Sequence, residues 1–581
     1  MSAETGEPTS RIVRRALPAA SNLPLGLHPV LRRIFTGRGA CEPEAIDFSL
    51  QALLRTEALS GMAAAVALLV SAVCEAQRIV FVADFDADGA TSCALGMRAL
   101  RACGAQYVDY VVPNRFEFGY GLTPPIVALV RAKEAALLVT VDNGISSLEG
   151  VAAARAAGMK VLITDHHLPG LHMPQADAIV NPNVPGDDFP SKALAGVGVI
   201  FYVMLALRAA LRSQGWFIEQ KIPEPNFGEL LDLVALGTVA DVVPLDANNR
   251  RLVAQGIARI RAGRAQPGIS ALLRVAGREP SKVVASDLGF AVGPRLNAAG
   301  RLADMSLGIE CLSSDDPARC SAIAGELDGL NRERRSLERD MKTQAIEQVL
   351  AELPETGEVP HGICVFDPAW HQGIVGVVAG RVKDLYHRPV VAFALASPDE
   401  LKGSARSIPG VHIRDVLDTV AARYPDLLSR FGGHAMAAGL SLSRAALTAF
   451  TAAFDAVIAE QVDPLALTPL VYTDGPLGER EMTLELARLL NTAAPWGQAF
   501  PEPLFDGEFE VSQRRLVGVD HLKLQLGLAG RSFAAIAFGA ADAPWAEARR
   551  IRAAYRLSVN EYQGNETLQL VIEHAEGLPN G

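Results

Sequence analysis

The sequence predicts a multidomain α/β protein: two α/β domains joined by a long helix and followed by a C-terminal β-barrel. Three observations support this. A chain of 581 residues is too long for a single hydrophobic core. From about 78 to 242, short β-branched runs alternate with Ala-rich segments of helical length, as in βαβ units around a parallel sheet. From about 465 onward, apolar residues alternate with a period of two, which is typical of antiparallel strands.

The first α/β domain is predicted from its strands. They are nearly continuous apolar runs, as expected of parallel strands buried on both faces. The candidate strands are residues 79–83, 107–112, 136–141, 160–164 and 178–180. Two longer apolar runs, 58–74 and 194–207, fall short of the roughly 20 residues that a membrane-spanning helix needs. We therefore interpret both runs as buried helices of a protein that has no membrane segment.

The rest of the chain gives three further elements. Residues 318–353 are rich in charge, which favours a long exposed helix that connects two domains. A second α/β region starts with the apolar run 362–366 and a Gly-rich stretch, 371–376, that opens a helix. Leu522, Leu524, Leu526 and Leu528 begin a barrel of about five strands, for which an OB-fold is the leading candidate. The predicted domains are an N-terminal segment (1–50), a catalytic α/β domain (51–317), a connecting helix (318–353), a substrate-binding α/β domain (354–460) and the barrel (465–577).

Charge and cysteine content limit the possible functions. The formal net charge of −11 argues against a generally basic nucleic-acid-binding surface, so any DNA contact needs a local basic track. Carboxylates gathered at a metal site would contribute to the same negative total. The seven cysteines include no C-x-x-C pair, which indicates reduced thiols rather than disulfides or structural zinc. With no apolar segment typical of a secretory signal near residue 1, we expect a cytoplasmic protein, and a monomer.

Acidic residues follow the ends of several predicted strands. Asp84, Asp86 and Asp88 follow the first strand, and Asp142 follows the strand at 136–141. Asp165-His166-His167 follows the strand at 160–164, and Asp241 ends the apolar run 233–240. Ligand sites of open parallel sheets lie at the carboxyl ends of the strands, so these residues should converge. One Asp at such a place is as well explained by helix capping. Four acidic loops together would repel one another unless a cation neutralised them.

The residue types indicate which metal and which reaction. Carboxylates with imidazole and no thiolate favour Mn²⁺ or Mg²⁺ over structural zinc. There are enough ligands for two divalent ions about 3.5–4 Å apart, a geometry that suits phosphodiester hydrolysis. Adjacent side chains of an extended chain point to opposite sides, so we expect different roles for the two histidines. His166 is predicted to bind a metal, and His167 to contact the scissile phosphate or the second metal.

These residues carry a family resemblance. Asp165-His166-His167 looks like the motif that names the DHH superfamily of phosphoesterases, and residues 84–92 resemble its first motif as the RecJ family has it. Further blocks at 114–121, 293–301, 403–407 and 432–434 also resemble that family. The resemblance implies a DHH domain, a linking helix, a DHH-associated domain and an OB-fold. It also implies metal-dependent 5′ to 3′ degradation of single-stranded DNA in repair and recombination, with single-strand-binding protein and a RecQ-type helicase as partners.

The resemblance also assigns site residues. The family's metal positions match Asp86, Asp88, Asp142, His166, His167 and Asp241. Many DHH proteins have a histidine where this chain has Val82, and we expect Asp84 to replace that ligand. Asp142, as the carboxylate that bridges both ions, together with His167 and Asp88 forms the predicted catalytic set.

A second set is predicted to bind substrate. By the resemblance, Arg115, Ser404 and Arg406 would hold a 5′-phosphate, and Gly432-Gly433-His434 would offer N–H groups and an imidazole to a phosphate. Local arginines would supply the basic track, and the barrel aromatics Phe533, Phe538 and Tyr562 would either stack on bases or fill the barrel core. The complete substrate set is Arg115, Arg295, Asn297, Arg301, Ser404, Arg406 and His434.

Two alternative functions remain at the level of sequence. One is a DHH phosphodiesterase for short oligonucleotides or cyclic dinucleotides, which needs only the two α/β domains. The other is a protein without metals that serves as a single-strand-binding scaffold. The barrel argues against the first alternative, and the full set of acidic residues argues against the second.

Overall fold

The computed structural model describes residues 10–113, 121–352 and 359–579. It divides into two compact units. The larger unit comprises Ala16–Asn331 and Thr483–Pro503, and the smaller unit comprises Met1–Arg15, Arg332–Met482 and Leu504–Gly581. The chain therefore passes from one unit to the other more than once, and each unit is described by itself.

The larger unit is built on a five-stranded parallel sheet in the order β3-β2-β4-β5-β6. Its strands are β2 (Ile79–Ala83), β3 (Val108–Val111), β4 (Leu137–Val141), β5 (Lys160–Thr164) and β6 (Ala178–Val180). β2 and β4 are buried along their whole length, as the continuous apolar runs predicted. Val80 and Val82 of β2 pack with α4 (Pro124–Ala132) and α5 (Leu148–Ala156).

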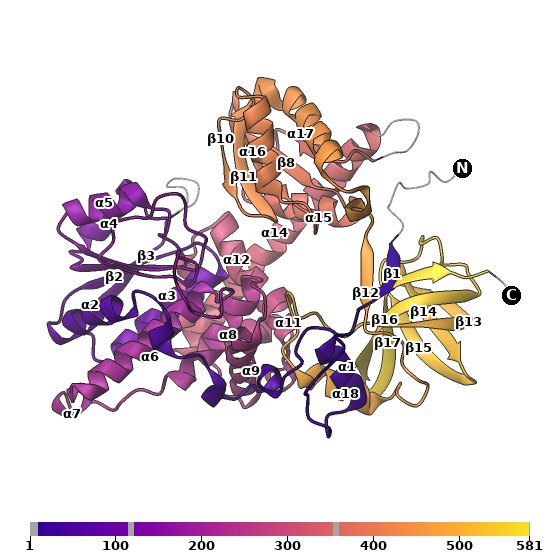
Figure 1. Ribbon diagram of the computed structural model, residues 1–581, viewed down its shortest axis with the longest axis horizontal. Coiled ribbons are helices and arrows are strands. Elements are labelled where there is room, and N and C mark those ends of the chain that lie inside the picture. The colour runs from indigo at the N-terminus through magenta and orange to yellow at the C-terminus, as the bar shows by residue number, and fades with distance from the viewer. Residues whose placement is uncertain (1–9, 114–120, 353–358, 580–581) are drawn as a thin grey trace. The chain divides into compact units, whose positions relative to one another are not determined.

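Helices cover both faces of this sheet (Figure 1). α4 and α5 lie on one face, and α2 (Met62–Cys74), α3 (Ala87–Ala102) and α6 (Gly196–Ser213) lie on the other. Of the described helices, α6 is long and apolar enough to span a membrane, as is the bent pair Leu50–Ala58 and Met62–Cys74. However, 61% of the α6 window is buried inside the protein, as in a core helix.

A helical layer follows α6 in the larger unit. It contains α7 (Trp216–Glu219), α8 (Leu231–Ala240), α9 (Ala247–Arg261), α10 (Pro267–Val275), α11 (Ala285–Asp287), the π-helix η6 (Leu288–Val292), α12 (Gly293–Leu302) and α13 (Ser306–Ser313). Before the sheet come α1 (Pro29–Thr36) and the 3₁₀ turns η1 (Pro43–Ile46), η2 (Leu50–Ala52) and η3 (Thr56–Ala58), and later turns are η4 (Phe227–Leu230) and η5 (Pro280–Lys282). The predicted connecting helix is α14 (Pro317–Glu352).

The smaller unit contains a second five-stranded sheet in the order β10-β11-β9-β8-β7. β7 and β8 are parallel and the other pairs antiparallel. The strands are β7 (Ile363–Phe366), β8 (Val390–Ser397), β9 (Glu400–Arg406), β10 (Arg430–Gly433) and β11 (Ala437–Ser443); the helices are α15 (Val375–Tyr386), α16 (Ile413–Arg423) and α17 (Leu447–Gln461), with the turns η7 (Arg444–Ala446) and η8 (Pro464–Leu467). Phe393, Phe450 and Phe454 lie in its core.

The C-terminal barrel is closed, in the order β13-β14-β15-β17-β16. Its strands are β13 (Phe505–Val517), β14 (His521–Leu528), β15 (Arg531–Ala537), β16 (Arg550–Tyr562) and β17 (Asn565–Gly577). Near it, β1 (Arg11–Arg14) pairs in parallel with β12 (Leu470–Thr473), and the Nε and Nη2 of Arg14 donate to the carboxylate of Asp506 in β13. The predicted fold class, with a parallel sheet, a second α/β domain, a long helix and a barrel, is confirmed.

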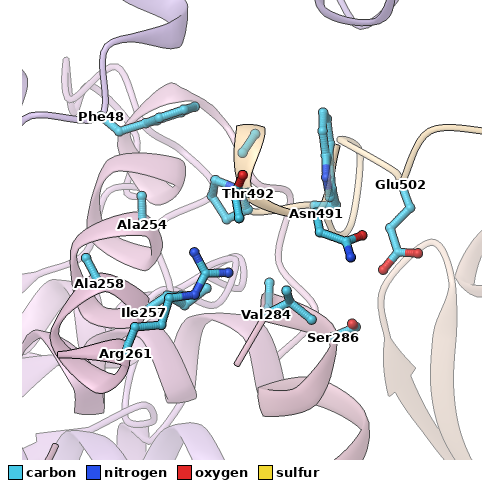
Figure 2. Close-up of a pocket in the computed structure, with 14 residues that line it drawn as sticks. Phe48, Ala254, Ile257, Ala258, Arg261, Val284, Ser286, Asn491, Thr492 and Glu502 are labelled. Atoms are coloured by element: carbon cyan, nitrogen blue, oxygen red, sulfur yellow. The ribbon is translucent and has the colours of Figure 1, made fainter. Parts of the chain in front are cut away.

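Between β12 and the barrel, the chain returns to the larger unit through α18 (Leu484–Ala493) and the loop up to Pro503. Figure 2 shows residues of this segment beside α9. Together with Phe48 and the segment 284–286, they line a cavity of about 200 Å³. Arg38 donates to the carbonyl of Pro501, and the Arg250 guanidinium lies 4.1 Å from the centre of the Phe500 ring. The predicted barrel range, 465–577, thus includes about twenty residues that pack with the other unit.

The close approach of α8 and α9 gives a test of this packing. A Cβ at Gly256 of α9 would lie 2.2 Å from the Leu231 carbonyl oxygen of α8. We expect Gly256→Ala to lower the free energy of unfolding by about 1–3 kcal/mol, because backbone must move to make room. Gly325 of α14 has open space at its Cβ position, so Gly325→Ala is a matched control that should raise stability by about 0.5–1 kcal/mol. Equal effects of the two substitutions in urea denaturation would contradict this packing.

Candidate metal centre

Three carboxylates, of Asp84, Asp86 and Asp88, lie directly after β2. The side chain of Asp86 accepts hydrogen bonds from the N–H groups of Asp88 (2.9 Å) and Gly89 (3.0 Å), so it is the N-cap of α3. Asp88, in the first turn, accepts from the N–H groups of Gly196 and Val197 where α6 begins. Asp84 is buried and accepts from the N–H of Phe85. The capping role of Asp86 uses one carboxylate oxygen, which leaves the other available for a ligand.

Glycines allow these carboxylates to lie close together. A Cβ at Gly89 would lie 2.5 Å from the Asp84 carbonyl oxygen, because α3 begins directly against the end of β2. A Cβ at Gly196 would lie 2.7 Å from Oδ1 of Asp142, and one at Gly237 of α8 would lie 2.8 Å from Oδ1 of Asp88. Larger residues at these positions would push the helices away from the acidic loops.

Asp142 lies at the centre of the cluster. It follows β4 with φ of +61° and is 1% exposed. Its Oδ1 lies 3.1 Å from Nε2 of His166. The adjacent Asn143 donates to the carbonyls of Val82 and Val141, which ties the ends of β2 and β4 together. The position of Asp142 is therefore fixed by the edge of the sheet.

Asp165 orients the histidine pair. Its Oδ1 accepts the N–H groups of His166 and His167 and lies 2.7 Å from Nδ1 of His167, while Oδ2 accepts the N–H of Ile145. With Nδ1 engaged, His167 presents Nε2 as the ligand atom, as in many carboxylate–histidine–metal sites. Asp165 was absent from the predicted site residues. The signal for its role is the Asp-x-His spacing directly after a strand.

One expectation from the sequence is wrong, and one open assignment is settled. The side chains of His166 and His167 do not point apart: their ring centres lie 4.6 Å apart and both face Asp142. The reason is that β5 ends at Thr164, so the alternation of an extended strand no longer applies. The apolar run 233–240, whose element type the sequence left open, is helix α8, and Asp241 is its C-cap. Because the run 233–240 is apolar on all sides, its periodicity could not distinguish a helix from a strand.

The seven predicted metal ligands come together from four loops. Their donor atoms form three groups, each within 4.8 Å: Asp142 with His166 and His167; Asp88 with His166 and Asp241; and Asp84 with Asp86 and Asp142. Nε2 of His166 and Oδ2 of Asp241 lie 3.4 Å apart, both are buried, and neither makes a hydrogen bond within the described residues. Oxygen and imidazole donors without sulfur fit Mn²⁺ or Mg²⁺.

Burial and mutual repulsion shift the pKa values of the titratable groups in the site. Burial and the neighbouring Asp241 raise the pKa of Asp88 to about 7, and burial and Asp86 do the same for Asp241. Burial and the charge of Asp88 raise the pKa of Asp142 well above its usual value. Burial acts to lower the pKa of His167, but its hydrogen bond to Asp165 outweighs this and raises the pKa to about 9.

The predicted substrate residues are dispersed. Arg295 is buried, with its guanidinium bonded to Asp328 and to the Ala291 carbonyl, which suits a structural role. Asn297 accepts the N–H of Ala87 and so joins α12 to the first acidic loop, and Arg301 is partly exposed on the same helix. Arg115 lies outside the described residues.

Three predicted substrate residues belong to the smaller unit. Arg406 donates to the Ser404 hydroxyl (3.0 Å), and a Cβ at Gly376, in the first turn of α15, would lie 2.8 Å from both side chains. His434 is exposed at the turn between β10 and β11. The glycine pair before it is therefore part of a hairpin. Of the barrel aromatics, Phe533 is buried, whereas Phe538 and Tyr562 are 61% and 69% exposed.

Comparison with known proteins places this geometry in a family. Family models match residues 78–238 (DHH family, N-terminal domain), 360–460 (DHHA1 domain) and 473–574 (RecJ OB domain). The single-stranded-DNA-specific exonuclease RecJ of Escherichia coli is 51% identical over 97% of this chain and 98% of its own length. The chain belongs to the RecJ family. RecJ of Haemophilus influenzae is 48% identical over 98% of this chain and 99% of its own.

Solved RecJ structures share the fold. RecJ from Thermus thermophilus in complex with Mn²⁺ has a TM-score of 0.78 at 30% identity, covering 95% of this chain and 76% of that one. The same protein in complex with Mg²⁺ has a TM-score of 0.72 at 29% identity, covering 95% and 75%. These metals agree with the oxygen-rich donor set of the candidate site.

The raised carboxylate pKa values predict how metal binding depends on pH. The pKa of Asp88 and Asp241 is about 7 in the folded protein, against about 3.9 when unfolded. Between these values the folded state holds the extra protons, so the metal-free protein loses stability as pH rises. Mn²⁺ must displace those protons. At fixed Mn²⁺ we expect a small gain in Tm near pH 5.5 and a clearly larger one near pH 8; a gain independent of pH would contradict this.

Proposed function

We propose that the seven-ligand cluster around Asp142 is the centre at which this RecJ-family chain hydrolyses single-stranded DNA. Membership of the family at about half identity over nearly the full length makes the protein a metal-dependent, single-stranded-DNA-specific exonuclease. The observation that carries the site assignment is the convergence of four acidic loops on one buried carboxylate. Divalent ions bound there would polarise the phosphodiester and make water a stronger nucleophile at neutral pH.

The roles we propose follow from each residue's position. Asp142, which shares donor groups with the histidines and with Asp84 and Asp86, is the residue that would hold both divalent ions. Asp88, held by the N-terminus of α6, would bind metal together with Asp86, Asp241 and His166. His167, held at Nδ1 by Asp165, presents Nε2 either to a metal or to an oxygen of the scissile phosphate. Asp84 takes the place of the histidine that is absent at Val82.

For polarity, we propose that the smaller unit binds a terminal 5′-phosphate. Ser404 and Arg406 lie against the first turn of α15, where Gly376 leaves room for both. Helix N-termini attract phosphate, and guanidinium forks bind its oxygens in pairs. Cleavage from the 5′ end follows if that phosphate is the fixed point of the substrate.

The barrel, in this proposal, holds the strand without reading its sequence. Arg515 and Lys523 are cross-strand partners on β13 and β14, and both are exposed. Like charges in this arrangement repel, so a phosphate backbone would relieve the repulsion. The exposed Phe538 and Tyr562 offer surfaces for base stacking. A long polymer is favoured over a cyclic dinucleotide for this reason.

The remaining assignments are also proposals. We propose domain boundaries at 50, 317, 353, 460 and 577, which separate the N-terminal segment, the catalytic domain, the connecting helix, the substrate-binding domain and the barrel. Because all donor atoms of the metal cluster come from one unit of one chain, we propose that a monomer is active. We further propose that it works in the cytoplasm on DNA coated by single-strand-binding protein and opened by a RecQ-type helicase.

The bridging role of Asp142 gives the first test. We expect Asp142→Ala to abolish hydrolysis at saturating Mn²⁺ while binding of single-stranded DNA persists, since loss of one repelled carboxylate leaves the fold intact. Asp232→Asn is the control, because Asp232 is equally buried in α8 but lies outside the cluster. The assay is digestion of single-stranded DNA labelled separately at each end, with and without Mn²⁺. Near-normal activity of Asp142→Ala would refute the assignment.

The phosphate pocket gives the second test. Wild-type protein should prefer 5′-phosphorylated over 5′-hydroxyl oligonucleotides, and Arg406→Ala should reduce that ratio of kcat/KM by about tenfold or more, since a charge-assisted hydrogen bond contributes roughly 1.5–3 kcal/mol. Arg430→Ala, an exposed arginine of the same sheet, should leave the ratio unchanged. If Arg406→Ala also leaves it unchanged, the terminal phosphate binds elsewhere.

A further inference from the structure

Three exposed apolar side chains accompany the metal cluster in the larger unit. Leu168 directly follows His167 and is 60% exposed; Val242 directly follows Asp241 and is 62% exposed; Phe290 is 80% exposed on the π-helix η6. We call Leu168, Val242 and Phe290 the apolar rim. Single exposed apolar residues are common, so exposure alone does not give the rim a function.

Backbone strain shows that Val242 is an unusual choice of residue. Val242 follows the last turn of α8 and its cap, with φ of +61°. This left-handed conformation is the usual place for glycine after a helix, and it is a genuine outlier for a β-branched residue. An exposed valine here costs stability and gains no burial in return. Strain of this kind is typical of functional sites.

Phe290 is held beside the same helix end. A Cβ at Gly289 would lie 3.1 Å from Cγ1 of Val239, and one at Gly293 would lie 3.0 Å from Cβ of Ala240. The two glycines therefore allow η6 to pack closely against the last turn of α8, next to Asp241. π-helical turns are rare and are frequent at functional sites. Phe290 lies between the two glycines, and its side chain is exposed to solvent.

The same segment reaches the acidic loop after β2. α12 continues directly from η6, and its Asn297 accepts the N–H of Ala87. A Cβ at Gly300 would lie 1.8 Å from the Phe85 carbonyl oxygen. η6 and α12 thus form one wall of the metal cluster, from Asp241 at one end to the loop of Asp84 and Asp86 at the other.

We propose that the apolar rim binds a nucleobase beside the scissile phosphodiester, with Phe290 stacked on its face and Val242 packed at its edge. This rests on the proposed hydrolysis of single-stranded DNA at the metal cluster. Unpaired bases expose apolar faces, and stacking on an aromatic ring accepts every base. The rim would thereby position the phosphate over the metals without selecting sequence, and a paired base, stacked on both sides, would not be available to it.

The test compares normal single-stranded DNA with oligonucleotides that carry one abasic site at each of the first four positions from the degraded end. With wild-type protein and Mn²⁺, one position should reduce kcat/KM by about fivefold or more. Phe290→Ala should lose a similar factor on normal DNA and show no abasic penalty, whereas Phe290→Trp should retain both. Ile218→Ala, which removes an equally exposed side chain from α7, should behave as wild type.

The outcomes separate this inference from the function it rests on. Wild-type hydrolysis of normal DNA tests the metal centre alone. The ratio of kcat/KM on normal DNA to kcat/KM on DNA with an abasic site tests the rim alone. An abasic penalty that Phe290→Ala leaves unchanged, or the absence of a penalty at every position, would overturn the proposal.

A second variant tests the strained valine. Val242→Gly should raise Tm by about 1–3 °C, because glycine adopts positive φ without strain, and should lower kcat/KM on normal DNA. A variant that is both more stable and less active supports a side chain kept for contact with substrate. Unchanged kcat/KM would contradict the role of Val242, and an unchanged Tm would contradict the strain on which that role depends.

Discussion

The mutual repulsion of buried carboxylates at one edge of a parallel sheet is the constraint around which the larger unit is organised. Asp84, Asp88 and Asp142 are almost fully buried, and burial raises the pKa of each. Such an arrangement is unfavourable unless cations compensate for it. The surrounding structure holds the carboxylates there nonetheless: glycines at 89, 196 and 237 permit the close approach, and the N-terminus of α6 donates to Asp88.

The two histidines of this site are held in place by hydrogen bonds to Asp165. Asp165 binds both backbone N–H groups and the Nδ1 of His167, so one carboxylate fixes the bend after β5 and the orientation of a ring. The hydrogen bond between Asp165 and the ring raises the pKa of His167, whereas burial lowers the pKa of His166. Two neighbouring imidazoles consequently have different proton affinities, because Asp165 contacts the ring of His167 and only the backbone N–H of His166.

The smaller unit has features suited to holding a polymer rather than cleaving it. Ser404 and Arg406 lie at the N-terminus of α15, and Arg515 and Lys523 form a like-charged pair on the barrel. The net charge of −11 is consistent with such local basic sites, because the acidic residues include those that the metal cluster needs. The chain links the barrel to the larger unit through Thr483–Pro503, whose residues pack beside α9.

The sequence alone predicted the sheet strands, the long helix, the barrel and the seven candidate metal ligands that the fold brings together, because hydrophobic periodicity and acidic residues at the ends of apolar runs are local signals. Tertiary structure decided the rest. It made the run before Asp241 a helix, brought the two histidine rings together, and buried Arg295 in an ion pair with Asp328. It also showed the strain at Val242. These features depend on backbone direction and on partners distant in sequence, which residue types and spacing do not encode.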